Sequence, residues 1–164
     1  MQTWRRGDIA GMSVGREHWW MKVTQSGALP WRRLRDGGIA LLLVTSRRTR
    51  RWVIPKGHIE PGLTAAASAA KEALEEAGVS GTIGRVGLGT FDYDKMQADG
   101  AVRRLRVRVY PLEVAEEHEH WDEQALRDRA WFTPQEAVAA TDEPELHAII
   151  ERFAARLMWS EAAT

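Results

Sequence analysis

The chain has 164 residues, a formal net charge of zero at pH 7 and a hydrophobic content of 44%. This length fits one domain, and the composition is that of an ordinary soluble globular protein rather than an intrinsically disordered chain. Cysteine is absent, which excludes disulfides, thiolate catalysis and cysteine-ligated metals. The longest apolar run, Ile39–Val44, is six residues, far below the roughly 20 residues of a membrane span. No secretory signal is visible, so we expect a cytoplasmic protein with no membrane partner.

Charge is divided unevenly along the chain. Residues 1–56 contain 12 Lys and Arg against 3 Asp and Glu, whereas residues 57–164 contain 11 against 20. One interpretation is an enzyme that holds polyphosphate and divalent cations together, because cations bridge carboxylates to phosphate oxygens. The other interpretation is that surface charges are distributed unevenly along the chain without any functional role. Nucleic acid is not favoured as a partner, because the domain as a whole is not basic.

The pattern of apolar and turn residues predicts one mixed α/β domain. Residues 1–25 lack clear periodicity and are expected to form an N-terminal arm, followed by a single domain over residues 26–160. Strands are predicted at Ala28–Leu34, Ile39–Thr45, Trp52–Ile54, Gly81–Tyr93, Ala101–Val114 and Ala130–Phe132. Helices are predicted at Thr64–Ala77, from Pro134 and at Glu143–Trp159, with a polar loop over Glu116–Arg127.

The first predicted helix carries the chemically informative residues. Thr64 is a plausible N-cap, and Gly78 lies just past the C-terminal end. Glu72, Glu75 and Glu76 fall on one face of this helix, because helical residues advance by roughly 100° each. Three carboxylates at this spacing repel one another. Divalent cations such as Mg²⁺ would relieve that repulsion; the alternative is a solvated acidic face.

The segment from Gly57 to Val79 resembles the Nudix box, a loop–helix–loop signature. The family pattern is Gly, five residues, Glu, seven residues, then Arg-Glu-apolar-x-Glu-Glu-x-Gly-apolar. The sequence matches this pattern, with its spacing intact, at Gly57, Glu72, Ala73, Glu75, Glu76, Gly78 and Val79. It departs at Leu63, where the pattern has its first Glu, and at Lys71, where the pattern has Arg. The resemblance extends over roughly residues 27–155.

The resemblance implies an α/β/α sandwich with a mixed central sheet and a pyrophosphohydrolase activity. Glu72, Glu75 and Glu76 would be the catalytic residues and, with the Gly57 carbonyl, would hold Mg²⁺ or Mn²⁺. Whether Glu75 or Glu76 is the base stays open. A further acidic ligand from a later loop is expected among Glu113, Glu116, Glu117 and Glu119.

Two stretches, Trp52–Gly57 and Trp121–Ala137, look like the Nudix branch that acts on diphosphoinositol and diadenosine polyphosphates. The resemblance therefore implies a small polyphosphorylated substrate. Candidate substrate-binding residues are Lys56, Arg51, His58 and Arg106. Each also has a plainer interpretation as a solvated charge or an incidental loop residue.

The two departures from the pattern leave other functions open. Lys71 keeps the positive charge and can pair with Glu75 one turn on, but lacks the planar fork of Arg. Leu63 removes a carboxylate outright. The alternatives are therefore a non-catalytic Nudix-fold module that senses a nucleotide, an RNA 5′-end pyrophosphohydrolase, or a structural domain with an acidic helix. A homodimer also stays open.

Overall fold

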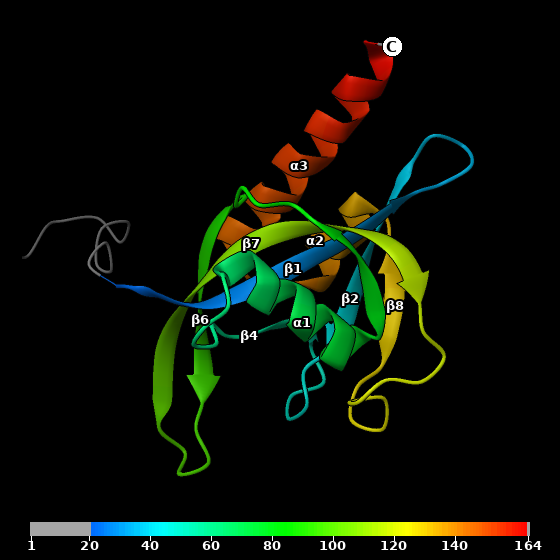
Figure 1. Ribbon diagram of the computed structural model, residues 1–164. Coiled ribbons are helices and arrows are strands. Elements are labelled where there is room, and N and C mark those ends of the chain that lie inside the picture. Colours follow the sequence, from blue (N-terminus) through cyan, green and yellow to red (C-terminus); the bar gives the residue numbers. More distant parts are fainter. Residues whose placement is uncertain (1–20, 164) are drawn as a thin grey trace, which may run out of the picture.

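The computed structural model describes residues 21–163, which form one mixed sheet flanked by three helices (Figure 1). The strands are β1 (Val23–Arg33), β2 (Ile39–Thr45), β3 (Trp52–Val53), β4 (Lys56–His58), β5 (Val79–Ile83), β6 (Gly89–Met96), β7 (Val102–Glu117) and β8 (Arg129–Phe132). The helices are α1 (Ala65–Ala77), α2 (Pro134–Ala140) and α3 (Pro144–Ala162). The sheet order is β3-β2-β1-β7-β5, with β4 on β1, β6 on β7 and β8 on β2. β1 and β7 are parallel and the other pairs are antiparallel, which confirms the predicted mixed sheet.

The helices cover both faces of the sheet, with α1 on one face and α2 and α3 on the other (Figure 1). Strand β2 is buried along its whole length, because alternate residues enter the two cores. Leu41 and Leu43 pack with Ile149 and Ile150 of α3. Leu42 and Val44 pack with the alanine-rich face of α1. Small residues on α1 let the helix carrying the three glutamates lie close to the sheet.

Both ends of α1 follow the sequence prediction. The Thr64 side chain accepts a hydrogen bond from the Ala67 N–H at 3.0 Å, which satisfies one of the free N–H groups of the first turn. Gly78 ends the helix in the left-handed conformation, with φ of 64°. The glutamate-bearing segment is thus defined by local sequence.

The structure corrects three boundaries. The single strand predicted over Gly81–Tyr93 is two strands, β5 and β6, because the chain turns between them and the Gly84 N–H bonds to the Pro111 carbonyl. β7 runs on to Glu117, where it pairs with Val79, so the polar loop begins later than predicted. β1 begins at Val23, where pairing with β7 extends it into the predicted arm. The rest of that arm, residues 1–20, lies outside the described residues. Among the described helices, none is long and apolar enough to cross a membrane.

Candidate active site

The site is built around the turn from β4 into α1. β4 pairs with β1, and the loop after it leads into the helix. The Glu72 carboxylate lies directly against Gly57: a Cβ added at Gly57 would overlap Glu72 Oε1. Any side chain at position 57 would therefore displace Glu72. This contact explains the glycine at the first position of the motif, and it places the Glu72 oxygens beside the backbone at residue 57.

Glu76 is the most enclosed of the three glutamates, with 6% of its surface exposed. Its carboxylate accepts hydrogen bonds from the Lys56 backbone N–H at 3.3 Å and from Arg127 Nη2 at 3.1 Å. Burial raises the pKa of Glu76 to about 7, against the opposing effect of the positive charges on Arg127 and Lys56. Glu76 is therefore held on the inner side of α1, beside the residue that precedes Gly57.

Glu72 and Glu75 lie closer to solvent. Burial raises the pKa of Glu72, and the negative charges of Glu75, Glu123 and Glu60 add to that rise. Lys71 Nζ lies 2.7 Å from Glu60 Oε1 and 3.6 Å from Glu75 Oε1. The predicted pairing of Lys71 with Glu75 is thus confirmed, although Glu60 is the closer partner.

The loop after β7 is anchored on the C-terminal end of α1, where helical carbonyls have no partner within the helix. The N–H of Glu123 donates to the Glu75 carbonyl, and the indole N–H of Trp121 donates to the Glu76 carbonyl. Arg129 Nη1 donates to the Ala77 carbonyl, and the His118 N–H donates to the Gly78 carbonyl. The C-terminal end of α1 therefore determines where this loop lies.

This anchoring brings Glu123 to the site, a residue that the sequence analysis missed. Glu123 raises the pKa of both Glu72 and Glu76. Arg127 Nη2 lies 3.1 Å from Glu76 Oε1 and 3.5 Å from Glu123 Oε1, and its Nη1 donates to the Thr45 carbonyl. Glu123 and Arg127 are four residues apart in the sequence, and this spacing is a weak indication that their side chains pair. Nothing in the sequence connected that pair to Glu76.

Of the four acidic residues expected from the sequence, Glu116 and Glu117 pair through their carboxylates with other side chains, whereas the contacts of Glu113 and Glu119 are made by the backbone. Glu113 pairs in register with Thr82 on β5, and Glu116 Oε2 lies 3.8 Å from His118 Nε2. Glu117 is shared by Arg32 and Arg129. Glu119 is exposed, and its carbonyl accepts from the Gln124 side chain. Glu123 is the loop carboxylate whose charge acts on Glu72 and Glu76.

The four candidate substrate-binding residues have different surroundings. Lys56 lies beside Glu76, with Nζ 4.6 Å from the centre of the Tyr93 ring. Burial lowers its pKa, and the charges of Glu76 and Glu143 oppose that fall. His58 is exposed at the end of β4.

The two arginines among these candidates are held by carboxylates. Arg51 bonds to Asp142. Arg106 forms a two-pronged pair with Asp92, with N–O distances of 2.7 and 2.9 Å, and also donates to the Met21 carbonyl. The structure thus brings Lys56 to the glutamates and gives the two arginines internal partners.

Comparisons of the sequence and of the fold relate this chain to known proteins. The NUDIX domain family model matches residues 24–153. Diphosphoinositol polyphosphate phosphohydrolase 3-beta of Bos taurus is 37% identical over 100 residues, which are 60% of this chain and 57% of that protein. Nudix hydrolase 12, mitochondrial, of Arabidopsis thaliana is 29% identical over 143 residues, covering 78% of this chain and 70% of that protein.

The fold is also similar to that of a solved structure. The C. elegans Ap4A hydrolase binary complex superposes with a TM-score of 0.63 and 26% identity, covering 83% of this chain and 98% of that one. The family model covers most of the chain, and its matched range includes the glycine, the three glutamates and Glu123. The chain therefore belongs to the NUDIX domain family.

Proposed function

We propose that this protein is a Mg²⁺- or Mn²⁺-dependent pyrophosphohydrolase that cleaves a phosphoanhydride bond in a small polyphosphorylated molecule. The observation that carries the proposal is the grouping of Glu72 over Gly57 with the buried Glu76 beside Lys56. The relatives named as diphosphoinositol polyphosphate phosphohydrolase and Ap4A hydrolase support a dinucleoside polyphosphate or a diphosphoinositol polyphosphate as the substrate.

The residues of the site fit a divalent cation by their donor chemistry. In the described part of the chain, no three His, Asp or Glu side chains already stand close enough together to hold a metal ion. However, Glu72 rests in a space that only a glycine at 57 leaves open. Burial raises the pKa of Glu72, and the charges of three neighbouring carboxylates, Glu75, Glu123 and Glu60, add to that rise. Hard oxygen donors under mutual repulsion suit Mg²⁺ or Mn²⁺.

We assign Glu72, Glu75, Glu76 and the Gly57 carbonyl as the groups that would hold the cations, with Glu123 as the added loop carboxylate. The cations would neutralise charge on the phosphate oxygens and lower the pKa of a bound water. Glu75 and Glu76 remain joint candidates for the base. The Lys56 backbone contacts Glu76 and its ammonium group lies over the Tyr93 ring, where it would pair with a phosphate oxygen.

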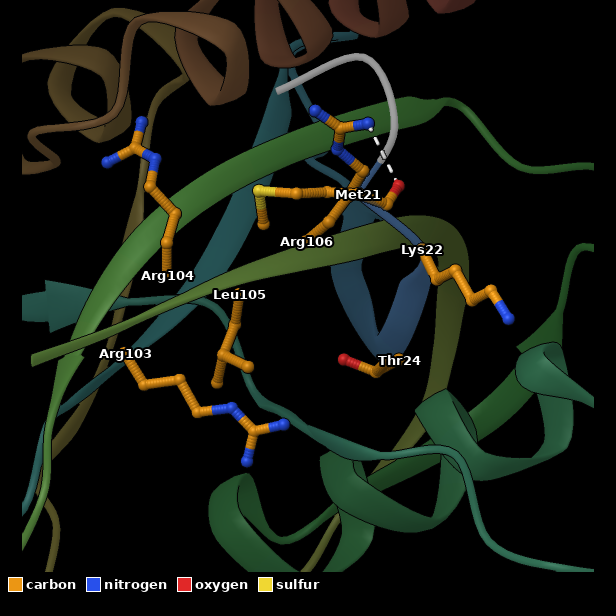
Figure 2. Close-up of a pocket in the computed structure, with 7 residues that line it drawn as sticks. All are labelled: Met21, Lys22, Thr24, Arg103, Arg104, Leu105 and Arg106. Carbon is orange, nitrogen blue, oxygen red and sulfur yellow. Dashed lines mark hydrogen bonds between the residues drawn. The ribbon is translucent and has the colours of Figure 1, made fainter. Parts of the chain in front are cut away.

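A pocket near the loop after Gly57 has basic lining residues, of which Lys22 and Arg103 would bind part of a phosphate chain. The pocket has a volume of about 320 Å³ and is lined by Met21, Lys22, Thr24 and the four residues from Arg103 to Arg106 (Figure 2). Figure 2 shows Arg104 and Arg106 on one side of β7 and Arg103 and Leu105 on the other. Arg104 and Arg106 pair with Asp94 and Asp92. The Thr24 carbonyl accepts from the Ile59 N–H, which joins the pocket to the loop after Gly57.

The replacement of the motif's first Glu by Leu63 gives little support to the alternative of a non-catalytic module. Its side chain is 40% exposed and its N–H bonds to the Glu60 carbonyl. Glu60 lies in the same loop and makes the close pair with Lys71. The glutamates from α1 keep their positions without a carboxylate at residue 63, so we expect catalysis to be retained.

Product release from a substrate panel tests the proposal. Purified protein with Mg²⁺ or with EDTA would meet diadenosine tetraphosphate, a diphosphoinositol polyphosphate, nucleoside triphosphates, a nucleotide sugar and a 5′-triphosphorylated RNA. We expect metal-dependent turnover of a dinucleoside or diphosphoinositol polyphosphate, lost in Glu72→Gln. Tight binding of a panel member without turnover, with either metal, would instead support a sensor module, and preferred turnover of the RNA would support the RNA-end activity.

A further inference from the structure

The Arg127 side chain joins three elements of the proposed site. It is 11% exposed, and its Nη1 donates to the carbonyl of Thr45, at the end of β2, at 3.1 Å. Its Nη2 donates to Glu76 Oε1 on α1 at 3.1 Å and lies 3.5 Å from Glu123 Oε1 in the loop after β7. One enclosed guanidinium therefore contacts the sheet and lies between a carboxylate of the helix and a carboxylate of the loop.

The position of Arg127 is set by the sheet as well as by these carboxylates. The next residue, Asp128, is bonded twice to Thr45: its N–H donates to Thr45 Oγ1 at 2.9 Å, and its carbonyl accepts from the Thr45 N–H at 3.0 Å. Together with the Nη1 bond, these contacts tie residues 127 and 128 to the end of a strand that is buried along its whole length. The guanidinium is thus held on a rigid element, from which it can orient the carboxylates that it contacts.

Both carboxylate oxygens of Glu76 accept hydrogen bonds. Oε1 accepts from Arg127 Nη2, and Oε2 accepts from the Lys56 backbone N–H at 3.3 Å. Donors on both oxygens fix the plane of a carboxylate, whereas one donor leaves it free to rotate. Each oxygen keeps a further lone pair, which remains able to bind a cation or a proton. Arg127 and the Lys56 N–H together therefore fix the orientation of the most enclosed glutamate.

Lys71 does not supply this contact from α1. It stands where the family motif has Arg, and its Nζ lies 2.7 and 2.9 Å from the two carboxylate oxygens of Glu60 and 3.6 Å from Glu75 Oε1. An ammonium group also lacks the planar fork of a guanidinium. The guanidinium that holds a glutamate of this helix comes instead from Arg127, 51 residues after Glu76.

One donor of Arg127 is unbonded. Its Nε is buried and has no hydrogen-bond partner among residues 21–163. An unbonded buried donor lowers stability, and a side chain that only stabilises a fold ordinarily has its buried donors bonded. Departures of this kind are expected at functional sites. The unbonded Nε therefore favours a functional role for the two amino groups that face Thr45 and the carboxylates.

We propose that Arg127 is a positioning residue of the proposed site: its guanidinium, held on the end of β2, fixes the Glu76 carboxylate in one orientation and keeps Glu123 beside it. Arg127 thereby supplies from the loop the planar fork that Lys71 does not supply from the helix. The inference rests on the proposed function. Arg127 acts through these two carboxylates rather than on the substrate.

Steady-state kinetics of Arg127→Lys test this role with the panel substrate that the wild type turns over, because lysine keeps the charge but not the fork. We expect kcat to fall by about 10- to 100-fold, since Glu76 and Glu123 are no longer held in one orientation. We expect KM to stay within about twofold, since no contact with the substrate is lost. If the lysine variant does not fold, Arg127→Gln takes its place with the same expected outcome.

Arg50→Lys is the matched control. The Arg50 guanidinium bonds to the Leu126 carbonyl and to Asp128, on either side of Arg127, instead of to a glutamate of α1. We expect its kcat to stay within about twofold of the wild type. Equal falls of kcat in the two variants would overturn the inference, because loss of contacts to the loop would then explain both. An unchanged kcat in Arg127→Lys would also overturn it, as would a rise in KM that accounts for the whole loss of kcat/KM, because that rise would show direct binding of the substrate.

Urea unfolding in EDTA at pH 8 tests the same contact without turnover. We expect Arg127→Lys to lower the free energy of unfolding more in the wild-type background than in the Glu76→Gln background, because the ion pair with Glu76 is present only in the first. Equal falls in the two backgrounds would overturn the inference. Turnover of no panel substrate by the wild type would overturn the proposed function instead, and the unfolding measurement would then decide whether Arg127 positions Glu76.

Discussion

Individual carboxylates in this protein differ by their partners rather than by their positions in the motif. Glu76 is buried against Lys56 and Arg127, Glu72 rests on Gly57, and Glu75 pairs with Lys71. Helical spacing alone places these three glutamates on one face of α1. Their different partners come from the parts of the chain that pack around the helix. Substitution of Glu76 is therefore expected to lower kcat more than substitution of Glu72 or Glu75.

Glu76→Gln is expected to lower kcat by about 100-fold or more, because it removes the charge while keeping an oxygen that accepts from Arg127. The fold should persist, since glutamine fills the same space. Turnover and circular dichroism check both expectations. Glu151→Gln, an exposed glutamate on α3, is the control and should leave turnover unchanged. Full activity of Glu76→Gln would refute the assignment of this residue.

The stability of the metal-free protein should depend on pH through Glu76. Its pKa is about 7 in the folded chain, against an ordinary value of 4.5. Between these values the folded state keeps a proton that the unfolded chain has lost, so stability is full below about pH 4.5 and falls as pH rises through 7. Glu72, whose pKa is also raised, acts in the same direction.

Urea unfolding in EDTA at pH 5 and pH 7.5 measures this effect. We expect a lower free energy of unfolding at pH 7.5 in the wild type and a smaller fall in Glu76→Gln. An equal fall in the two proteins would show that Glu76 does not cause it.

At the scale of elements, the C-terminal end of α1 and the loop from His118 to Arg129 form one unit. Four successive carbonyls, from Glu75 to Gly78, accept bonds from this loop. Local signals predicted α1, its N-cap and its glycine. They could not predict this docking, because it joins residues 40 to 52 positions apart through tertiary packing. This is why the sequence favoured Glu113, Glu116, Glu117 and Glu119 and missed Glu123.

Gly78→Ala should weaken this unit. Gly78 has φ of 64°, and an added Cβ would lie 2.7 Å from Trp121 Cδ2 and from Arg129 Nη1. We expect a loss of about 1–3 kcal/mol in the free energy of unfolding, together with faster amide exchange in the loop. Gly100→Ala is the control, because it has a similar φ but no neighbour within 4 Å. Equal losses in the two variants would show that backbone strain alone is responsible.

At the scale of the whole molecule, the sheet separates two cores. One joins the sheet to α1, which carries Glu72, Glu75 and Glu76, and the other joins it to α2 and α3. The continuous apolar run of β2 predicted a strand buried on both faces. The order of strands and the pairing of β1 with β7 depend on long-range contacts that no local pattern carries.

Ile150→Ala tests whether the two cores on opposite faces of the sheet are independent, because Ile150 is fully buried in the core formed with α2 and α3. We expect the free energy of unfolding to fall by about 2–5 kcal/mol, while kcat of the folded protein stays within about twofold. Chemical denaturation and kinetics at low temperature measure the two quantities. A large fall in kcat without a fall in stability would show that the two faces are coupled.

Hydrolysis in ¹⁸O-labelled water tests whether water attacks phosphorus at this site in a reaction that needs the carboxylates and a divalent cation. The protein would be incubated with Mg²⁺ and the panel substrate that it turns over, and the products analysed by mass spectrometry. We expect one ¹⁸O atom in a phosphate of one product, and no product in EDTA or with Glu76→Gln. Product formed without ¹⁸O, or formed equally in EDTA, would contradict an attack by water at phosphorus that depends on these carboxylates and a divalent cation.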